Sequence, residues 1–219
     1  PTGNFGDIFA GYVAKHMGLP VRRLRIASNV NDILVRTLKT GIYEVREVHA
    51  TASPSMDIQI SSNFERLVFE ATGRNAAAVR ALMGSLAQSG RFVLPDAALA
   101  KIRADFDAGR ADETETAAAI RAAWREAGEL VDPHPAVAVA VADQDKPVSP
   151  VPNIVLSTAH AAKFPDAVEA ACGVRPTLPA WLGDLMTRPE LITVMANDRG
   201  EVERFVRSVS RAVKQGVAG

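Results

Sequence analysis

The sequence predicts an α/β fold that carries an alanine-rich helical region. Near the amino end, a polar loop, a helix, an apolar strand and a second helix follow one another within residues 1–41. Such a close alternation of helix and strand is typical of an α/β unit. From residue 64 to residue 142 the chain is rich in alanine and its pattern favours helices. The expected architecture is therefore an α/β core to which several short helices are attached.

The elements of the first part are bounded by glycine and proline. Gly18 and Pro20 follow the first helix, as residues that end helices commonly do, and Gly41 follows the second. A polar segment that contains Pro54 comes next, and loops of this kind often carry binding residues. The predicted elements are helices at 8–17 and 31–38, a strand at 21–27 and a loop at 51–63.

The second part is predicted to be mostly helical. Its expected helices are 64–71, 76–88, 96–106, 113–127, 135–142, 166–172, 179–186 and 201–214. Short strands are expected at 91–94 and 153–156, a surface connection at 144–151 and a loop at 157–163. Trp124 and Trp181 are interpreted as core residues and not as binding groups, and Cys172 as a small buried apolar side chain.

The composition disfavours several classes of function. Lys and Arg total 25, and Asp and Glu also total 25, so the formal net charge is zero and gives no electrostatic case for a nucleic-acid partner. No apolar run approaches the roughly 20 residues that span a bilayer, so no membrane partner is expected. Cys172 is the single cysteine, and His134 and His160 stand alone, so no metal site is expected. These features suit a cytoplasmic protein.

The glycine-containing loop at the start is the strongest chemical signal. Gly3 and Gly6 let backbone amides approach an anion closely, and the helix that follows presents unpaired N–H groups. A phosphate suits this position. The alternative is a simple turn in which Asn4 or Asp7 caps the helix, and the spacing alone does not decide between them. The loop lacks the residues of a P-loop and the pattern of a dinucleotide fold.

Five blocks in order resemble threonine synthases of the bacterial and fungal branch. They are Pro1-Thr2-Gly3-Asn4-Phe5-Gly6-Asp7, Ile26-Ala27-Ser28-Asn29-Val30-Asn31-Asp32, Ala52-Ser53-Pro54-Ser55-Met56-Asp57-Ile58 with Ser61-Ser62-Asn63-Phe64-Glu65-Arg66, Asp132-Pro133-His134-Pro135-Ala136-Val137-Ala138, and Ser157-Thr158-Ala159-His160-Ala161-Ala162-Lys163-Phe164-Pro165. Their order is more specific than any one block, although the chain beyond about residue 175 is less distinctive. The resemblance implies the carboxy-terminal part of a fold type II, tryptophan synthase beta-like enzyme over residues 1–219.

The resemblance also implies an activity and a cofactor. Threonine synthases are lyases that use pyridoxal 5'-phosphate to convert O-phospho-L-homoserine and water to L-threonine and phosphate, in threonine biosynthesis. By this similarity Gly3, Asn4, Phe5 and Asp7 would contact the cofactor, whose phosphate would meet the loop amides. Thr158 would face the pyridine nitrogen with a neutral hydroxyl. O-phospho-L-homoserine is the expected small-molecule substrate, and the oligomeric state is left open.

Other polar residues have an ordinary structural interpretation beside a functional one. Lys163 could bind the substrate phosphate, since a phosphate needs cationic partners, or it could be a solvated lysine at a helix start. Asn29 and Asn31 could line a cleft or serve as turn and capping residues, and capping is favoured for Asn31. His134 and His160 are acid–base candidates, but histidines at helix starts are commonly structural.

The family's Schiff-base lysine is expected upstream of Pro1, so no catalytic residue is assigned within the chain. Pro1 is accordingly interpreted as an interior position of a longer parent, and residues 1–219 alone are expected to be inactive. Two rivals remain for the parent or the chain. One is another fold type II enzyme, such as a dehydratase or β-replacement synthase, and the other is a non-catalytic module that binds a phosphorylated metabolite.

Overall fold

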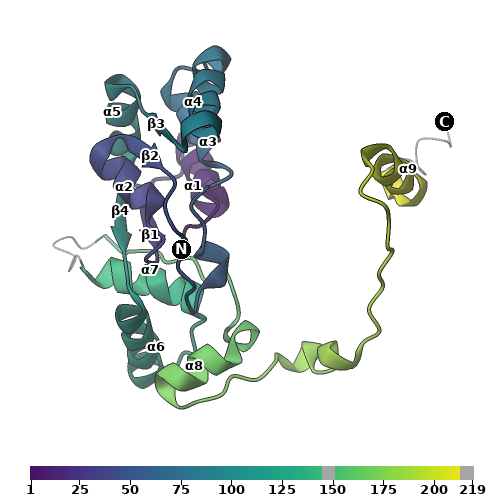
Figure 1. Cartoon of the computed structure of the whole chain (residues 1–219). Coiled ribbons are helices and arrows are strands. Elements are labelled where there is room, and N and C mark those ends of the chain that lie inside the picture. Colours follow the sequence, from purple (N-terminus) through teal and green to yellow (C-terminus); the bar gives the residue numbers. More distant parts are fainter. Residues whose placement is uncertain (145–150, 213–219) are drawn as a thin grey trace. The chain divides into compact units, whose positions relative to one another are not determined.

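The computed structural model describes residues 1–144 and 151–212, which form two compact units. The first unit comprises Pro1–Thr177 and the second Leu178–Gly219. Helices of the first unit are α1 (Gly6–His16), α2 (Ile33–Thr40), α3 (Phe64–Ala71), α4 (Ala76–Ser89), α5 (Asp96–Asp105), α6 (Glu113–Ala127), α7 (Pro133–Gln144) and α8 (Pro165–Cys172). Its strands are β1 (Leu24–Ser28), β2 (Ile42–Glu44), β3 (Arg91–Val93) and β4 (Phe106–Arg110) (Figure 1).

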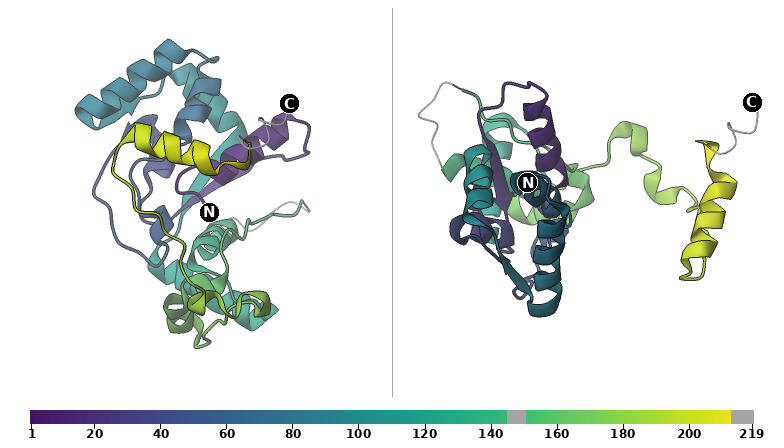
Figure 2. Two further views of the ribbon diagram at one scale, coloured as in Figure 1. Left: turned by 90° about the vertical axis from the view of Figure 1, so that its right-hand side faces the viewer. Right: turned by 90° about the horizontal axis from the view of Figure 1, so that it is seen from above.

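Two strand pairs organise the first unit. β1 pairs with β4 in parallel, with Ile26 opposite Ala108, and β2 pairs with β3 antiparallel. Helices α1, α2 and α7 contact β1, and the two further views show these helices around the β1–β4 pair (Figure 2). The carboxyl ends of parallel strands in α/β proteins commonly border ligand sites. A ligand site is therefore expected near the end of β1 at Ser28.

The core of the first unit is divided into three apolar clusters. The largest joins α1, α2, α3 and α5 around β1, and includes Phe5, Tyr43 and Phe106. A second lies between the end of β1 and α7, and a third holds α6, α7 and α8 together. The α7 helix therefore belongs to two clusters, so it connects the β1–β4 pair to the helices that follow.

The second unit has little regular structure of its own. It contains two single 3₁₀ turns, Ala180–Leu182 and Leu185–Thr187, and the helix α9 (Arg199–Val209). Asp198 caps α9 by accepting a hydrogen bond from Glu201 N–H at 2.8 Å. Most of its large apolar side chains are exposed, including Trp181 at 76%, whereas Leu182 and Phe205 are half-buried.

Most of the helices expected from sequence are confirmed, and the residues of α3 and α6 coincide with the expected ones. The helix expected at 179–186 is wrong, because only two 3₁₀ turns form there. The strand expected at 153–156 is also wrong, since no neighbouring strand pairs with it, and Trp181 is not a core residue. The sequence did not predict β2 or β4. The connection expected at 144–151 lies mainly outside the described residues.

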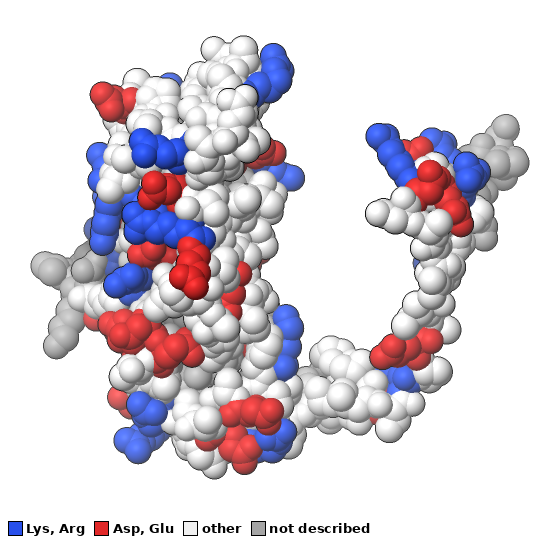
Figure 3. All heavy atoms as spheres, in the orientation of Figure 1, with Lys and Arg blue, Asp and Glu red and all other residues white. Residues whose placement is uncertain are grey.

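The surface of the first unit mixes both signs of charge. Lys and Arg side chains lie beside Asp and Glu side chains on the face that Figure 3 shows. Arg36 and Arg110 both pair with Asp32, for example, at 2.9 and 3.2 Å. Within residues 1–144 and 151–212, no helix has the length and apolar character to cross a membrane.

Two glycines provide a test of this packing. A Cβ atom at Gly109 in β4 would lie 2.6 Å from Val141 Cγ1 in α7, whereas one at Gly84 in α4 would meet no atom within 4 Å. We expect Gly109→Ala to lower the free energy of unfolding by about 1–3 kcal/mol through overpacking. Gly84→Ala should raise it by about 0.5–1 kcal/mol, because alanine favours a helix. Denaturant unfolding measures both, and equal effects would contradict the close contact of β4 with α7.

Candidate functional site

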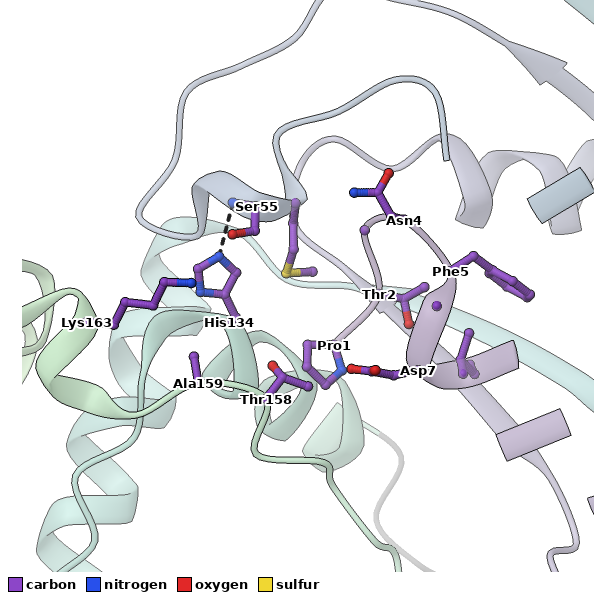
Figure 4. Close-up of a pocket in the computed structure, with 14 residues that line it drawn as sticks. Pro1, Thr2, Asn4, Phe5, Asp7, Ser55, His134, Thr158, Ala159 and Lys163 are labelled. Atoms are coloured by element: carbon purple, nitrogen blue, oxygen red, sulfur yellow. Dashed lines mark hydrogen bonds between the residues drawn. The ribbon is translucent and has the colours of Figure 1, made fainter. Parts of the chain in front are cut away.

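A cavity of about 270 Å³ lies in the first unit beside the start of α1. Its wall is formed by residues 1–8, by the 3₁₀ turn Pro54–Met56, and by side chains that include His134 and Thr158. The loop of residues 1–7 occupies one side of the cavity, and Ser55, His134 and Lys163 occupy the other (Figure 4). Segments that are distant in sequence therefore meet at one place.

The residues that sequence analysis assigned to a site all line this cavity. They are Gly3, Asn4, Phe5, Asp7, Thr158 and Lys163. Their roles remain predictions, since position in a wall does not identify what the wall binds. Sequence analysis did not assign Ser55, and it treated His134 as a candidate without placing it in a site. The block of residues 52–58 was a signal for Ser55, but nothing in that block indicated which of its side chains would reach the cavity.

The loop of residues 1–7 is anchored through the N–H group of Thr2 and through the carbonyl groups of Gly3 and Asn4. Thr2 N–H first donates to Ala27 O in β1 at 2.8 Å, which ties the loop to the end of that strand. Ser61 Oγ donates to Gly3 O at 2.7 Å. Asn63 donates twice to Asn4 O, from its backbone N–H at 3.1 Å and from Nδ2 at 2.8 Å. In a planar trans peptide the N–H points away from the C=O, so these anchors direct the N–H groups of Asn4 and Phe5 away from residues 61–63.

Six consecutive backbone N–H groups consequently have no acceptor. Among the described residues, none accepts a hydrogen bond from the N–H groups of residues 3–8, whereas Phe9 N–H already bonds to Phe5 O at 3.3 Å. The last three of them belong to the first turn of α1, where the helix has its positive end. All six residues line the cavity. This backbone is an anion cradle, which is the term used below for the N–H groups of residues 3–8.

The two glycines differ in what they contribute. A Cβ atom at Gly3 would lie 2.7 Å from Ser55 O and 3.2 Å from Met56 Cα, so only glycine permits this contact of two backbones. A Cβ atom at Gly6 would meet only Asn63 Nδ2, at 3.9 Å. Neither glycine has a positive φ angle, which in this loop belongs to Phe5 at 64°. The missing side chain of Gly6 leaves the approach to these N–H groups open, as the sequence analysis expected of a glycine at this position.

Phe5 holds its unusual backbone conformation through its ring. A positive φ is uncommon for a residue with a side chain and costs on the order of 1 kcal/mol. The ring is 1% exposed and lies 5.4 Å from the ring of Phe64 and 5.7 Å from that of Phe106. Burial of an aromatic ring stabilises by more than this cost. The core therefore sets the conformation of the cradle at its centre.

Tyr43 holds the Ser61 anchor in place through a hydrogen bond. Its hydroxyl oxygen accepts a hydrogen bond from Ser61 N–H at 2.7 Å, and Ser61 in turn holds Gly3 O. Burial raises the pKa of the Tyr43 phenol above its ordinary value, and the hydrogen bond from Ser61 opposes this only in part. The phenol therefore stays neutral around pH 7.

Asn29 and Asn31 fix the Pro54–Met56 turn and do not line the cavity. Asn29 Nδ2 donates to Asp57 Oδ1 at 2.8 Å and to Ser53 Oγ at 3.0 Å. Asn31 Nδ2 donates to the same Asp57 oxygen at 3.0 Å. The interpretation of Asn31 as a helix cap is wrong, because Asp32 occupies that position and the Asn31 side chain is used in this buried network.

Thr158 and Lys163 leave their polar groups available at the cavity. No hydrogen bond within the described part of the chain involves the Thr158 hydroxyl, and Lys163 Nζ forms no ion pair there but lies 5.4 Å from the centre of the Phe164 ring. His160 is structural, since its Nδ1 accepts from Ala162 N–H at 3.1 Å and caps the turn Ala161–Lys163. Residues 1–144 and 151–212 contain no group of three or more metal-binding side chains.

The arrangement suits a ligand that carries a phosphate. The cradle offers donors and the positive end of α1, while Thr158 and Lys163 offer a neutral hydroxyl and a cation elsewhere in the wall. Asp7 also lines the cavity, and an ionised carboxylate can only accept hydrogen bonds, so it would contact a donor of the ligand and not its phosphate. A flat ligand with a phosphate at one end and polar atoms on its ring matches these positions.

Comparison with known proteins agrees with this chemistry. The family model described as "Threonine synthase, C-terminal" matches residues 135–206. Threonine synthase of Pseudomonas aeruginosa is 46% identical over 207 residues, which cover 94% of this chain and 44% of the relative. The crystal structure of PLP-bound threonine synthase from Brucella melitensis aligns with a TM-score of 0.84 and 61% identity, over 96% of this chain and 45% of that one.

A second solved structure extends the likeness to fungi. Threonine synthase from yeast aligns with a TM-score of 0.77 and 34% identity, over 98% of this chain and 47% of that chain. The chain thus spans less than half the length of the relatives it matches. The α/β fold class expected from sequence is confirmed by these neighbours. On sequence and fold together, the chain belongs to the threonine synthase family and corresponds to its carboxy-terminal part.

Proposed function

We propose that this chain is the carboxy-terminal portion of a cytoplasmic threonine synthase. The whole enzyme would convert O-phospho-L-homoserine and water to L-threonine and phosphate with pyridoxal 5'-phosphate, in threonine biosynthesis. The lysine to which the cofactor attaches would precede Pro1, in the part of the enzyme that corresponds to the remaining length of the relatives. The identity of 46% with a named threonine synthase supports the proposal.

The anion cradle is the observation that carries it. The six N–H groups, which have no acceptor among residues 1–144 and 151–212, can be satisfied by an anionic ligand or by solvent, and a phosphate is the anion that this backbone suits best. The relative from Brucella melitensis contains PLP, whose single phosphate would occupy such a cradle. Gly3, Asn4 and Phe5 would then donate through their amides, and Asp7 would accept from a donor of the cofactor.

The bound cofactor would supply an electron sink for the reaction, while this chain positions and tunes it. Thr158 would hydrogen-bond the pyridine nitrogen with a neutral hydroxyl. A hydroxyl does not keep that nitrogen protonated, in contrast to a carboxylate, so Thr158 would moderate the electron withdrawal of the ring.

Lys163 is the proposed ligand of the substrate phosphate. It lies on the side of the cavity away from the cradle, so two phosphates would bind at separate ends (Figure 4). The ammonium group of Lys163, which lies near the ring of Phe164, is available for a charge-assisted hydrogen bond. This separation favours a substrate that carries its own phosphate over substrates of dehydratases, which do not.

The products of the reaction test the proposed activity directly. We expect the full-length enzyme that contains this chain to release phosphate and threonine in equal amounts from O-phospho-L-homoserine. L-serine and L-threonine should give little keto acid, because they lack the group that Lys163 would bind. A coupled phosphate assay and chromatography of the products measure this. Rapid keto acid formation from serine would instead favour the dehydratase rival, and binding without any turnover would favour the non-catalytic module.

The cradle is tested by Gly6→Val in the same full-length enzyme. The side chain finds open space in the protein but occupies the approach to the N–H groups, so the cofactor-free protein should melt at nearly the same temperature. Loss of two or three charge-assisted hydrogen bonds, at about 1.5–3 kcal/mol each, would weaken cofactor binding by orders of magnitude. Absorbance titration measures the affinity, and thermal melting of the cofactor-free protein serves as the stability control.

Gly3→Ala is the matched comparison for that variant. Its Cβ atom would press on Ser55 O, so both melting temperature and cofactor affinity should fall. If Gly6→Val leaves the affinity unchanged, the loop is a structural turn and the cradle does not bind the cofactor phosphate.

Thr158→Val tests the proposed contact with the pyridine nitrogen. The substitution keeps the shape and removes the hydroxyl, so cofactor affinity should fall roughly two- to tenfold with a shift of the cofactor absorbance. Thr114→Val is the control, since Thr114 is an exposed residue of α6 outside the cavity. Unchanged affinity, spectrum and turnover in the Thr158 variant would show that this residue is not the partner of the nitrogen.

A further inference from the structure

Asp132 and His134 form a buried pair at the start of α7. His134 Nδ1 lies 2.7 Å from Asp132 Oδ1, and the same oxygen accepts the backbone N–H of His134 at 2.8 Å. The side chain of His134 is 6% exposed and that of Asp132 is 0% exposed. Phe164 packs on the imidazole with ring centroids 5.1 Å apart. The ring of His134 is therefore held in one orientation from two sides.

The remaining ring nitrogen identifies the protonation state of His134. Ser55 N–H donates to His134 Nε2 at 3.1 Å, and a backbone N–H can only donate. Nε2 therefore carries a lone pair, and the proton of the neutral imidazole is on Nδ1. Nδ1–H then donates a hydrogen bond to Asp132 Oδ1. The contact between Asp132 and His134 is consequently a hydrogen bond and not an ion pair.

Ser55 connects His134 to the anion cradle, because it bonds to His134 Nε2 through its N–H and lies against Gly3 through its carbonyl oxygen. The Pro54–Met56 turn abuts Gly3 so closely that a Cβ atom there would lie 2.7 Å from Ser55 O. Asp57, just after the turn, is held by Asn29 and Asn31. The turn is thus fixed at its far side by this amide network, and at the cavity by the hydrogen bond from Ser55 N–H to His134 Nε2 (Figure 4).

We propose that His134, kept as the Nδ1–H tautomer by Asp132, is a positioning residue that sets the cradle by holding Ser55 against Gly3. This inference rests on the proposed function, because it assigns to His134 the placement of the cofactor phosphate. His134 acts through the Ser55 turn and takes no part in proton transfer while Ser55 N–H occupies Nε2. Its effect is therefore expected on binding of the cofactor and of the substrate, not on a proton transfer.

Two amide variants of the full-length enzyme separate this role from simple packing. His134→Gln places an amide near the position of Nε2 and can still accept from Ser55 N–H. His134→Asn reaches only to the position of Nδ1, so it can bond to Asp132 but not to Ser55. Both variants lose the aromatic contact with Phe164. A difference between them therefore reports on the bond to Ser55.

We expect His134→Asn to weaken binding of pyridoxal 5'-phosphate by about tenfold or more and to raise KM for O-phospho-L-homoserine. His134→Gln should restore the affinity to within about threefold of the unmodified enzyme, although both variants melt at similarly reduced temperatures. Absorbance titration, steady-state kinetics and melting of the cofactor-free enzyme provide the three measurements. If His134→Asn does not fold, His134→Leu replaces it, since leucine also lacks an acceptor and suits a buried site.

Equal cofactor affinity in the two variants would overturn the proposal and leave His134 as a packing residue. A loss of kcat with unchanged affinity in both would also overturn it, because the ring would then act on the reacting atoms. The cofactor titration needs no substrate. If the unmodified enzyme binds cofactor but does not convert O-phospho-L-homoserine, the proposed function fails, and the comparison of the two variants still decides the role of His134.

Discussion

The orientation of two peptide groups determines the rest of the site. Ser61 and Asn63 hold the carbonyls of Gly3 and Asn4, and the planarity of the peptide bond then turns the next N–H groups the other way. Without these anchors the loop could satisfy its own donors with its own carbonyls. The Ser61 anchor is itself held by Tyr43, whose hydroxyl oxygen accepts the Ser61 N–H. The proposed attraction of the site for anions therefore depends on a network whose members Tyr43, Ser61 and Asn63 do not line the cavity.

The core contributes directly to this geometry. Phe5 stands at the centre of the cradle with a positive φ angle, which its buried ring maintains against Phe64 and Phe106. Phe106 is the first residue of β4, and β4 pairs with β1, whose Ala27 anchors the loop through Thr2 N–H. The strand pair and the cradle thus share the same supports. If the cradle binds the cofactor phosphate as proposed, a substitution of Phe64 or Phe106 would change the cofactor affinity as well as the stability of the fold.

The predictions from sequence were correct where an element is bounded by local signals, and they failed where it depends on contacts with distant segments. Helices such as α3 and α6 were predictable because local signals bound them, including the capping box of Asp112 and Glu115 and the glycine after α6. The strand β4 was not predictable, since Phe106–Arg110 has no strand pattern and exists through its pairing with β1. Asn31 was misread as a cap for the same reason. Its partners, Asp57 and His49, are distant in sequence.

The sequence by itself determined the family resemblance and, through it, part of the cavity lining, because ordered blocks of side chains record the chemistry of a site. It could not determine how those residues act. That Gly3 is required by contact with Ser55, that Phe5 has the unusual backbone angle, and that His134 accepts from Ser55 all depend on distances between separate blocks. Only the tertiary structure decided these points, since it brings residues 3, 55 and 134 together, and no local pattern encodes a contact between segments so far apart.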